Sequence, residues 1–343
     1  MGSGAKNWEI GGDWDMHQLE ELIRGKRVVF VTTKNIDYIR NVQEIRFLED
    51  YAGKLKLIYS GRRNYMVRIL EVWWKLFILG GRYDVVFFGF LPQLVAPFFM
   101  KYRNQKIVID FFVSVYDTMV NDRKKIAVWN PLARLCHWVD AYVIRKADYV
   151  VTDTKADAAY FIREFGGDRD KFRIVYLEAD RAVYYPREQR KRKDLENRFV
   201  VLYFGSVLPL QGVDVVLKAV ELLKDRKDIF FQVIGPVSKK YRTPVQDNVE
   251  YIDWLGQEDL AEYIANADLC LAGHFDGKID KAKRTIPGKA YIYSAMGKQM
   301  ILGDNKANRE LYGDKDLVYW TVMGDADALA EVILQCSRFH SPR

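Results

Sequence analysis

Short apolar runs alternate with helix-length segments along most of the chain, and this alternation limits the possible folds more than any other feature. The runs are rich in Val, Ile, Phe and Tyr and are almost free of polar residues, which is typical of strands covered on both faces. In the first half they lie at residues 27–32, 56–59, 85–88, 106–109, 149–152 and 172–177. The pattern predicts a parallel sheet with helices on both of its faces.

The same alternation starts again after a polar, strongly charged stretch at residues 186–198. Apolar runs return at residues 199–204, 229–234, 249–252, 269–272, 299–302 and 318–320, with helical segments between them. We therefore expect two α/β domains, residues 1–190 and 191–325, joined by the charged stretch. The amphipathic residues 326–343 form a C-terminal helix that could cross back to the first domain.

Length and composition fit two globular domains, since the chain has 343 residues, of which 49% are hydrophobic and 29% charged. No run approaches the roughly 20 apolar residues that a membrane-spanning helix needs, and the first residues lack the pattern of a signal peptide. The three cysteines are far apart, without metal-ligand spacing. We expect a cytoplasmic protein.

The positive charge is concentrated in the first half of the chain. Residues 1–192 hold 33 Lys and Arg against 24 Asp and Glu, whereas residues 193–343 hold 20 against 22. No helix-turn-helix, zinc-finger or RNA-binding pattern accompanies this charge, so nucleic acid is not an expected partner. A membrane surface or an anionic lipid-linked substrate is favoured, and a well-solvated surface is the alternative.

The stretch VVLYFGSVLPLQGVDVVLKAV, residues 200–220, predicts an anion site. A buried strand runs into Gly205, and Gly212 opens an amphipathic helix whose first amides would point back over the loop. A diphosphate loop normally includes cations, but this one has Ser206 and Gln211. In open parallel sheets ligands bind at the carboxyl ends of the strands, so two such sheets facing each other would form the binding cleft between them.

Four segments in order, FGSVLPLQGVDVVLKAV, FFQVIG, VEYIDWLG and KAKRTIPGKAYIYSAMGKQMILGDNKANREL, resemble the donor-binding half of group 1 glycosyltransferases, the retaining family 4 with the GT-B fold. In the first half, IVIDFFVSVYDTMVNDRK and ADYVVTDTKADAAYFIREFG resemble the acceptor domain of that family. The resemblance implies two Rossmann-like domains facing across a cleft. It also implies a retaining hexosyltransferase that moves a sugar from a nucleotide-sugar to a glycan or polyprenyl-linked saccharide, in polysaccharide or glycoconjugate biosynthesis.

The resemblance also implies which residues bind the donor. Family members commonly have Arg and Lys at the positions of Ser206 and Gln211, and two glutamates at those of Arg284 and Ile292, so this chain resembles an atypical subfamily. Arg284 and Lys289 flank a helix start after Pro287 and could replace the missing cations. The expected donor-binding residues are Gly205, Ser206, Gln211, Gly212, Gly235, Pro236, Trp254, Leu255, Arg284, Lys289 and Ile292.

Catalytic residues follow from the same resemblance. Family members place a polar residue of the first domain near the sugar, which points to Asp110 first and Asp117 second, with Arg284 on the leaving diphosphate. The alternative for either aspartate is a helix cap or a salt bridge to Arg123 or Lys124. His274 could contact sugar hydroxyls or be a solvated loop histidine. The histidines show no metal-ligand spacing, so we expect neither a metal nor a bound cofactor besides the nucleotide-sugar co-substrate.

Aromatic and basic residues mix in residues 65–103, where Trp73, Trp74 and Phe77 lie among arginines and lysines. Such a segment could lie on the inner face of a membrane as an interfacial helix, or it could be ordinary core of the first domain. A different class of function, a catalytically silent protein of this fold that binds a glycan or a partner, also stays open because four donor positions are changed.

Overall fold

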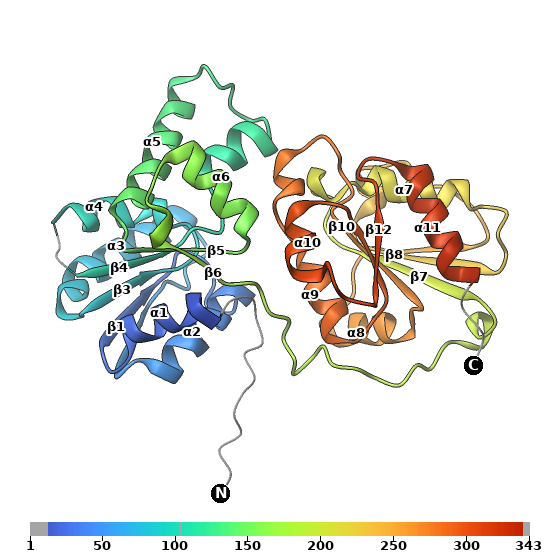
Figure 1. The fold of residues 1–343 in the computed structure, drawn as a ribbon, viewed down its shortest axis with the longest axis horizontal. Coiled ribbons are helices and arrows are strands. Elements are labelled where there is room, and N and C mark those ends of the chain that lie inside the picture. Colours follow the sequence, from blue (N-terminus) through green and yellow to red (C-terminus); the bar gives the residue numbers. More distant parts are fainter. Residues whose placement is uncertain (1–12, 103–104, 339–343) are drawn as a thin grey trace, which may run out of the picture. The chain divides into compact units, whose positions relative to one another are not determined.

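The computed structural model describes residues 13–102 and 105–338, which form two compact units divided between Leu177 and Glu178. Each unit is built on a six-stranded sheet in which every neighbouring pair of strands is parallel (Figure 1). The predicted α/β class with two parallel-sheet domains is confirmed.

The first unit has strand order β2-β1-β3-β4-β5-β6. Its strands are β1 (Arg27–Val31), β2 (Lys54–Ile58), β3 (Val85–Phe88), β4 (Lys106–Asp110), β5 (Tyr149–Thr152) and β6 (Phe172–Ile174). Its α-helices are α1 (Asp13–Ile23), α2 (Ile39–Tyr51), α3 (Tyr65–Leu79), α4 (Ala96–Tyr102), α5 (Pro131–Lys146) and α6 (Lys155–Phe165). Because parallel crossovers are right-handed, α3, α4, α5 and α6 cover one face of this sheet and α2 covers the other (Figure 1).

The second unit has strand order β12-β11-β10-β7-β8-β9. Its strands are β7 (Phe199–Phe204), β8 (Ile229–Ile234), β9 (Val249–Ile252), β10 (Leu269–Gly273), β11 (Met300–Gly303) and β12 (Val318–Thr321). Its α-helices are α7 (Val213–Leu222), α8 (Gln257–Asn266), α9 (Gly288–Ala295), α10 (Lys306–Tyr312) and α11 (Ala326–Arg338). Read from its first strand, this is the strand order of dinucleotide-binding folds.

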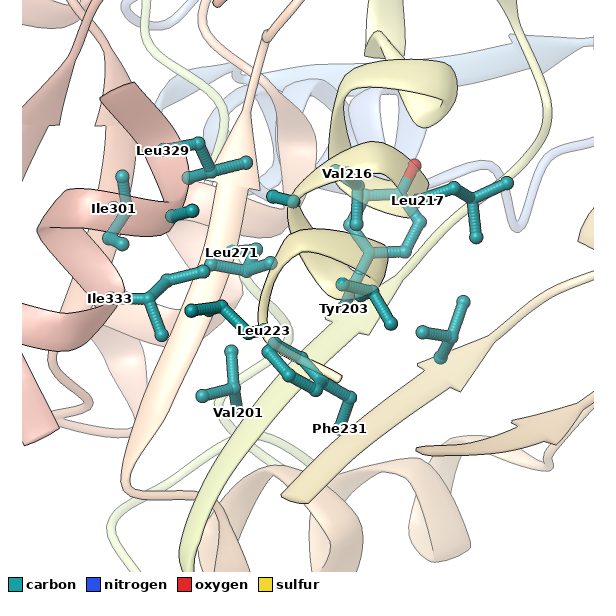
Figure 2. Packing of buried hydrophobic residues seen from close by; sticks show 14 of the residues in the cluster. Val201, Tyr203, Val216, Leu217, Leu223, Phe231, Leu271, Ile301, Leu329 and Ile333 are labelled. Atoms are coloured by element: carbon teal, nitrogen blue, oxygen red, sulfur yellow. The ribbon is translucent and has the colours of Figure 1, made fainter. Parts of the chain in front are cut away.

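The core of the second unit shows why the central strands are almost wholly apolar. Side chains on alternate positions of β7, such as Val201 and Tyr203, pack under α7, and Leu329 and Ile333 of α11 pack beside them (Figure 2). Val200 and Leu202 of β7 face the opposite side of the sheet and are also buried. A strand covered on both faces therefore has no position for a solvated side chain, as the sequence pattern predicted.

The C-terminal helix α11 packs into the core of its own unit, and a crossing of residues 326–343 to the first domain stays a prediction. Among the described residues, α11 packs against α7 and β12, and Leu329, Ile333 and Cys336 are buried in the core of the second unit. The apolar face of α11 is therefore buried inside the second unit. Residues 339–343 lie outside the described part of the chain.

The division between the units also lies earlier than the boundary expected at residue 190. Residues expected to be linker are tied to the second unit: Arg187 pairs with Glu258 and Glu262 of α8, and Lys191 pairs with Asp268 before β10. A charged stretch without apolar periodicity resembles a linker in sequence, because its ion-pair partners are some 70 residues away. None of the helices in residues 13–102 and 105–338 is both long and apolar enough to cross a bilayer.

Candidate functional site

The second sheet reverses its strand order between β7 and β10, and the loops that follow these two strands meet there. The backbone N–H of Phe275, after β10, donates to the carbonyl of Gln211, after β7, at 3.3 Å. Since neighbouring loops diverge at such a point, the carboxyl edge of the sheet opens for a ligand. The geometry of Gly205, Gln211 and α9 around this edge defines the candidate site.

Glycines let the backbone approach closely at this edge. The N–H of Gly205 donates to the carbonyl of Ile234 at 3.0 Å, and the N–H of Gly235 donates to the carbonyl of Ile252 at 2.7 Å. A Cβ on Gly235 would lie 2.1 Å from the carbonyl oxygen of Gly205. Only glycine fits at Gly235, because its φ of +135° is also one that other residues rarely adopt.

Lys289 on the first turn of α9 is the unusual group of the site. It is only 5% exposed, and its Nζ has no hydrogen-bond partner among the described residues. The Nζ lies 3.9 Å from the centre of the Tyr203 ring, and burial lowers the pKa of Lys289 well below its usual value. A buried amine of this kind lacks the anion that would make its charged form stable.

Three polar atoms converge on Gly205. A Cβ there would meet Gln211 Oε1 at 3.2 Å, Lys289 Nζ at 3.3 Å and the Tyr203 hydroxyl at 3.4 Å, and the Tyr203 hydroxyl donates to Gln211 Oε1 at 3.3 Å. The α9 N-terminus beside them has neither a side-chain cap nor an acidic residue in its first turn. An unpartnered amine beside an uncapped helix N-terminus is suited to an anion such as a phosphate.

His274 follows β10 and is buried. Burial, and then the nearby charges of Lys289 and Lys281, lower the pKa of His274 to about 3, so its ring is neutral near pH 7. Its Nδ1 has no hydrogen-bond partner among the described residues. The sequence left open whether this histidine is a solvated loop residue, and the structure places it in the interior.

The other expected residues of the two donor loops are placed as follows. Arg284 is buried, Ile292 is half-buried on the second turn of α9, and Ser206 is exposed. Gly212 is occupied by packing, because a Cβ on it would lie 2.5 Å from both Asp276 N and Phe275 C and its φ is +64°. The loop after β10 thus covers the start of α7, and Gly205 faces the polar cluster.

The residues expected near a nucleotide base lie further along the same edge. Pro236 follows β8, and Trp254 and Leu255 follow β9, the outermost strand on that side. Ser238 Oγ donates to Asp253 Oδ1 at 3.4 Å and joins these two loops. Trp254 is 79% exposed. A row from Trp254 through Pro236 and Gly205 to Lys289 therefore lines the carboxyl edge of β9, β8 and β7.

Asp110 ends β4 in the first unit, and its carboxylate is fully buried. Arg40 Nη2 of α2 donates to Asp110 Oδ1 at 3.1 Å, and Arg40 also pairs with Glu44 at 3.4 Å. Burial, and then the charge of Asp110, raise the pKa of Glu44 well above its usual value, against the opposing effect of Arg40. The salt bridge that the sequence allowed for Asp110 exists, with Arg40 in place of Arg123 or Lys124.

Asp117 is also buried, and it opens the π-helical segment Asp117–Asp122. Its Oδ1 accepts from Asn121 Nδ2 at 3.0 Å and from the Tyr160 hydroxyl at 3.2 Å. The preceding turn is held by Asp140 of α5, which accepts from Ser114 Oγ at 2.7 Å and from the backbone of Tyr116 at 2.9 Å.

Sequence reasoning missed Tyr203, Arg40 and Asp140. Tyr203 lies in an apolar strand and gives no polar signal of its own, whereas Arg40 and Asp140 act on partners 70 and 26 residues away. Asp110 and Asp117 belong to the first unit and Arg284 to the second, so each is placed only within its own unit. No group of three or more His, Cys, Asp or Glu in residues 13–102 and 105–338 is arranged to hold a metal ion.

Comparisons with known proteins agree with this fold. Residues 198–338 match the family described as glycosyl transferases group 1. The MMP alpha-(1->4)-mannosyltransferase of Mycolicibacterium hassiacum is 28% identical over 143 residues, which cover 39% of this chain and 34% of that protein. The chitobiosyldiphosphodolichol beta-mannosyltransferase of Kluyveromyces lactis is 22% identical over 271 residues, 67% of this chain and 58% of that protein. The matches thus span about a third to somewhat over half of these relatives.

Solved structures match over most of the chain. Anabaena HepE in complex with UDP has a TM-score of 0.62 at 14% identity, covering 91% of this chain and 90% of that one. WaaG, a glycosyltransferase involved in lipopolysaccharide biosynthesis, has a TM-score of 0.61 at 14% identity with the same coverage. At such identity these two likenesses show the fold alone. Residues 198–338, most of the second unit, therefore match the group 1 glycosyltransferases, and the two parallel-sheet units have the GT-B fold of these solved structures.

Proposed function

We propose that the chain is a retaining glycosyltransferase that moves a sugar from a nucleotide-sugar donor to a glycan or lipid-linked saccharide. The observation that supports this most is Lys289, a buried amine with no hydrogen-bond partner in residues 13–102 and 105–338, at the strand-order reversal of the second sheet. A diphosphate would supply the missing counter-charge. HepE was solved with UDP and with UDP-glucose, so uridine diphosphate is the first nucleotide to test.

In the proposed reaction the bond between the sugar C1 and the diphosphate oxygen breaks, and a bond from C1 to an acceptor hydroxyl oxygen forms. The departing diphosphate takes the acceptor's proton. Negative charge develops on the leaving oxygen, where protonated Lys289 and the guanidinium of Arg284 would stabilise it. These cations would take over the neutralising part that a metal ion plays in other transferases, so we propose a metal-independent reaction without a bound cofactor.

Retention of configuration rests on the resemblance to family 4. The names of the two mannosyltransferase relatives include one alpha and one beta linkage. The configuration of this chain's product must therefore be measured to test retention. An α-configured donor should give an α-configured product, which the one-bond carbon–proton coupling at the anomeric C1 measures by NMR. A β product would overturn the retaining mechanism and leave the transferase activity standing.

For the first unit we propose that Asp117 approaches the reacting sugar and that Asp110 positions its loop. Asp110 has no exposed side-chain surface and is paired with Arg40, so direct contact with a substrate would require that pair to open. Asp117→Asn should then lower kcat, whereas Asp110→Asn should lower thermal stability as well as kcat. An unchanged kcat in Asp117→Asn would exclude its role at the sugar.

The donor site is tested by calorimetric titration of the chain with UDP, GDP and ADP. Lys289→Met should lower the affinity for the preferred nucleotide by about tenfold or more, as expected for loss of one charge-assisted contact. Lys298→Met is the matched control, since Lys298 is also a partly buried lysine of the second unit, but its Nζ donates to the carbonyl of Ala265 at 2.9 Å. Equal losses in both variants, or no binding of any nucleotide by the wild type, would overturn the proposal.

The family match to the donor-binding half favours an enzyme over the catalytically silent alternative. For the acceptor we propose a glycan or a polyprenyl-linked saccharide, used by a cytoplasmic protein at the inner face of a membrane. Peripheral contact through residues 65–103 belongs to this proposal, and the surface of the first unit provides its physical basis.

A further inference from the structure

The helix α3 has an apolar stripe that the first unit does not bury. Only Val72 and Leu76 of this helix are buried, whereas Met66, Leu70, Trp74 and Phe77 are 57 to 66% exposed. These four residues recur at the spacing of one helical face, and we call them the α3 stripe. The part of the chain expected to be either interfacial helix or core is therefore mostly surface.

The stripe continues onto α4. The rings of Trp73 and Phe77 are stacked at 5.9 Å, and Trp73 meets Phe98 of α4 edge to face at 6.0 Å. Phe98 is itself 64% exposed. Two helices from the same face of the sheet thus present one aromatic surface, whereas isolated exposed apolar residues are common on any protein.

The helix α5, on the same face of the sheet, has exposed apolar side chains of its own. It contacts α4, and its Leu132, Leu135 and Trp138 are about half exposed, with Trp129 more exposed just before the helix. Large aromatic and aliphatic side chains on consecutive helices of one face would bury apolar area against any partner that covers them. Tryptophan in particular favours the boundary between headgroups and acyl chains.

The charges around this face are positive. Arg62 and Arg63 precede α3 and are exposed, Arg82 follows it and is exposed, and Lys75 lies within it. The acidic residues of α3 and α5 are Glu71, which pairs with Lys75 at 2.6 Å and with Arg62 at 3.6 Å, and the buried Asp140. The face has cations to spare and lacks an unpaired exposed carboxylate on these two helices.

The charge of the whole chain follows the same division. The first unit, residues 1–177, has 28 Lys and Arg against 21 Asp and Glu, and the second unit has 25 against 25. The formal charge of +7 therefore lies entirely in the unit that bears the α3 stripe. An anionic surface would attract this unit, whereas the second unit has no net charge for it to attract.

We propose that the α3 stripe with Phe98 is the surface by which this protein binds an anionic lipid bilayer. Apolar and aromatic side chains would enter the headgroup boundary while Arg62, Arg63 and Arg82 lie among lipid phosphates. A second copy of the chain fits less well, because a symmetric contact would bring these cations against their own copies. This inference rests on the proposed function and specifies the residues and the lipid charge of its peripheral membrane contact. Membrane binding is independent of nucleotide binding, so it can fail while the donor site stands.

The experiment is co-sedimentation of the full chain with vesicles of phosphatidylcholine alone and of equal parts phosphatidylcholine and phosphatidylglycerol. The wild type should bind the mixed vesicles and lose most of this binding when salt is raised. Trp74→Ser combined with Phe77→Ser should weaken binding about tenfold or more, since apolar burial is lost. Arg62→Gln combined with Arg63→Gln should weaken it about fivefold for each charge.

A matched control comes from the second unit. Val245→Ser combined with Val322→Ser also removes two exposed apolar side chains and should leave vesicle binding unchanged. Failure of the wild type to bind mixed vesicles, or equal binding by the Trp74/Phe77 variant, would overturn the proposal. So would a dimer in analytical ultracentrifugation that this variant disperses. Nucleotide affinity measured on the same samples separates a failure of the proposed membrane binding from a failure of the proposed donor site.

Discussion

At the scale of single residues, Lys289 links stability to function. Burial lowers its pKa, so at pH values between its folded pKa and the ordinary lysine value of about 10.4 the unfolded chain binds more protons. The free energy of unfolding therefore rises with pH in that window. Lys289→Met should remove this slope and stabilise the second unit by roughly 1–3 kcal/mol at neutral pH.

Urea unfolding of wild type and Lys289→Met at pH 7 and pH 9 measures this effect. The gain of the variant should be larger at pH 7 than at pH 9, and it should coincide with the loss of nucleotide affinity. A variant less stable than the wild type at pH 7 would mean that the amine makes a favourable interaction in the unliganded protein.

Gly235 should tolerate no side chain. Gly235→Ala combines a positive φ with a Cβ 2.1 Å from the Gly205 carbonyl oxygen, so the loops after β7 and β8 must separate. Gly297→Ala is the matched control, because Gly297 has φ +65° but nothing within 4 Å of its Cβ position. Gly297→Ala should cost about 1–2 kcal/mol from backbone strain alone, and Gly235→Ala clearly more, by thermal denaturation. Equal costs would contradict the close approach.

Residue identity in the candidate site could be predicted only in part. Gly205, Gln211 and Lys289 stand near glycine and proline signals in the sequence, and the structure brings these three together. Tyr203 and His274 could not be predicted as site residues, because a tyrosine in a buried strand and a histidine in a loop occur for many reasons. Their surroundings depend on the packing of strands that are distant in sequence.

At the scale of elements, the pair of α2 and β4 contains more buried carboxyl groups than cations. The pKa of Glu44 is raised well above its usual value, because burial and the charge of Asp110 disfavour ionisation, so Glu44 keeps its proton at pH values where an exposed glutamate has lost it. In the pH range above about 4.3 the folded state then binds more protons than the unfolded one, so stability falls as pH rises toward the folded pKa. Glu44→Gln should flatten this dependence, by up to about 1.4 kcal/mol per pH unit.

Thermal unfolding of Glu44→Gln and wild type from pH 5 to pH 8 provides the measurement. Glu49→Gln, a change elsewhere on the same helix at an acidic residue that is exposed, should leave the pH dependence as it is in the wild type. An unchanged dependence in Glu44→Gln would mean that the Glu44 carboxyl is already ionised in the folded state over this pH range.

The elements themselves follow closely from the sequence, since strands buried on both faces need uninterrupted apolar runs. The run expected at residues 56–59 is the strand Lys54–Ile58, which begins earlier because Lys54 and Lys56 lie at the edge of the sheet. An edge strand tolerates polar side chains that a central strand does not. The contact of Arg40 with Asp110 could not be predicted, because it joins α2 to β4 across 70 residues.

At the scale of the whole molecule, two units with separate cores should unfold separately. Differential scanning calorimetry should show two transitions, one for each unit. UDP should raise the midpoint temperature of the second unit's transition only, because at one hundred times its dissociation constant it adds about 2.7 kcal/mol to the free energy of unfolding of that unit. Lys289→Met should lose most of this shift. A nucleotide that raised both transitions equally would place part of its site in the first unit.

The ion pairs of Arg187 with Glu258 and Glu262, and of Lys191 with Asp268, determine where the second unit can be exchanged between related proteins. A hybrid joined between Leu177 and Glu178 transfers these pairs intact with their partners. A hybrid joined after residue 190 divides Arg187 from α8 and leaves two glutamates facing a foreign segment. The ancestry of the connecting segment, and not its exact length, should therefore decide which hybrids fold.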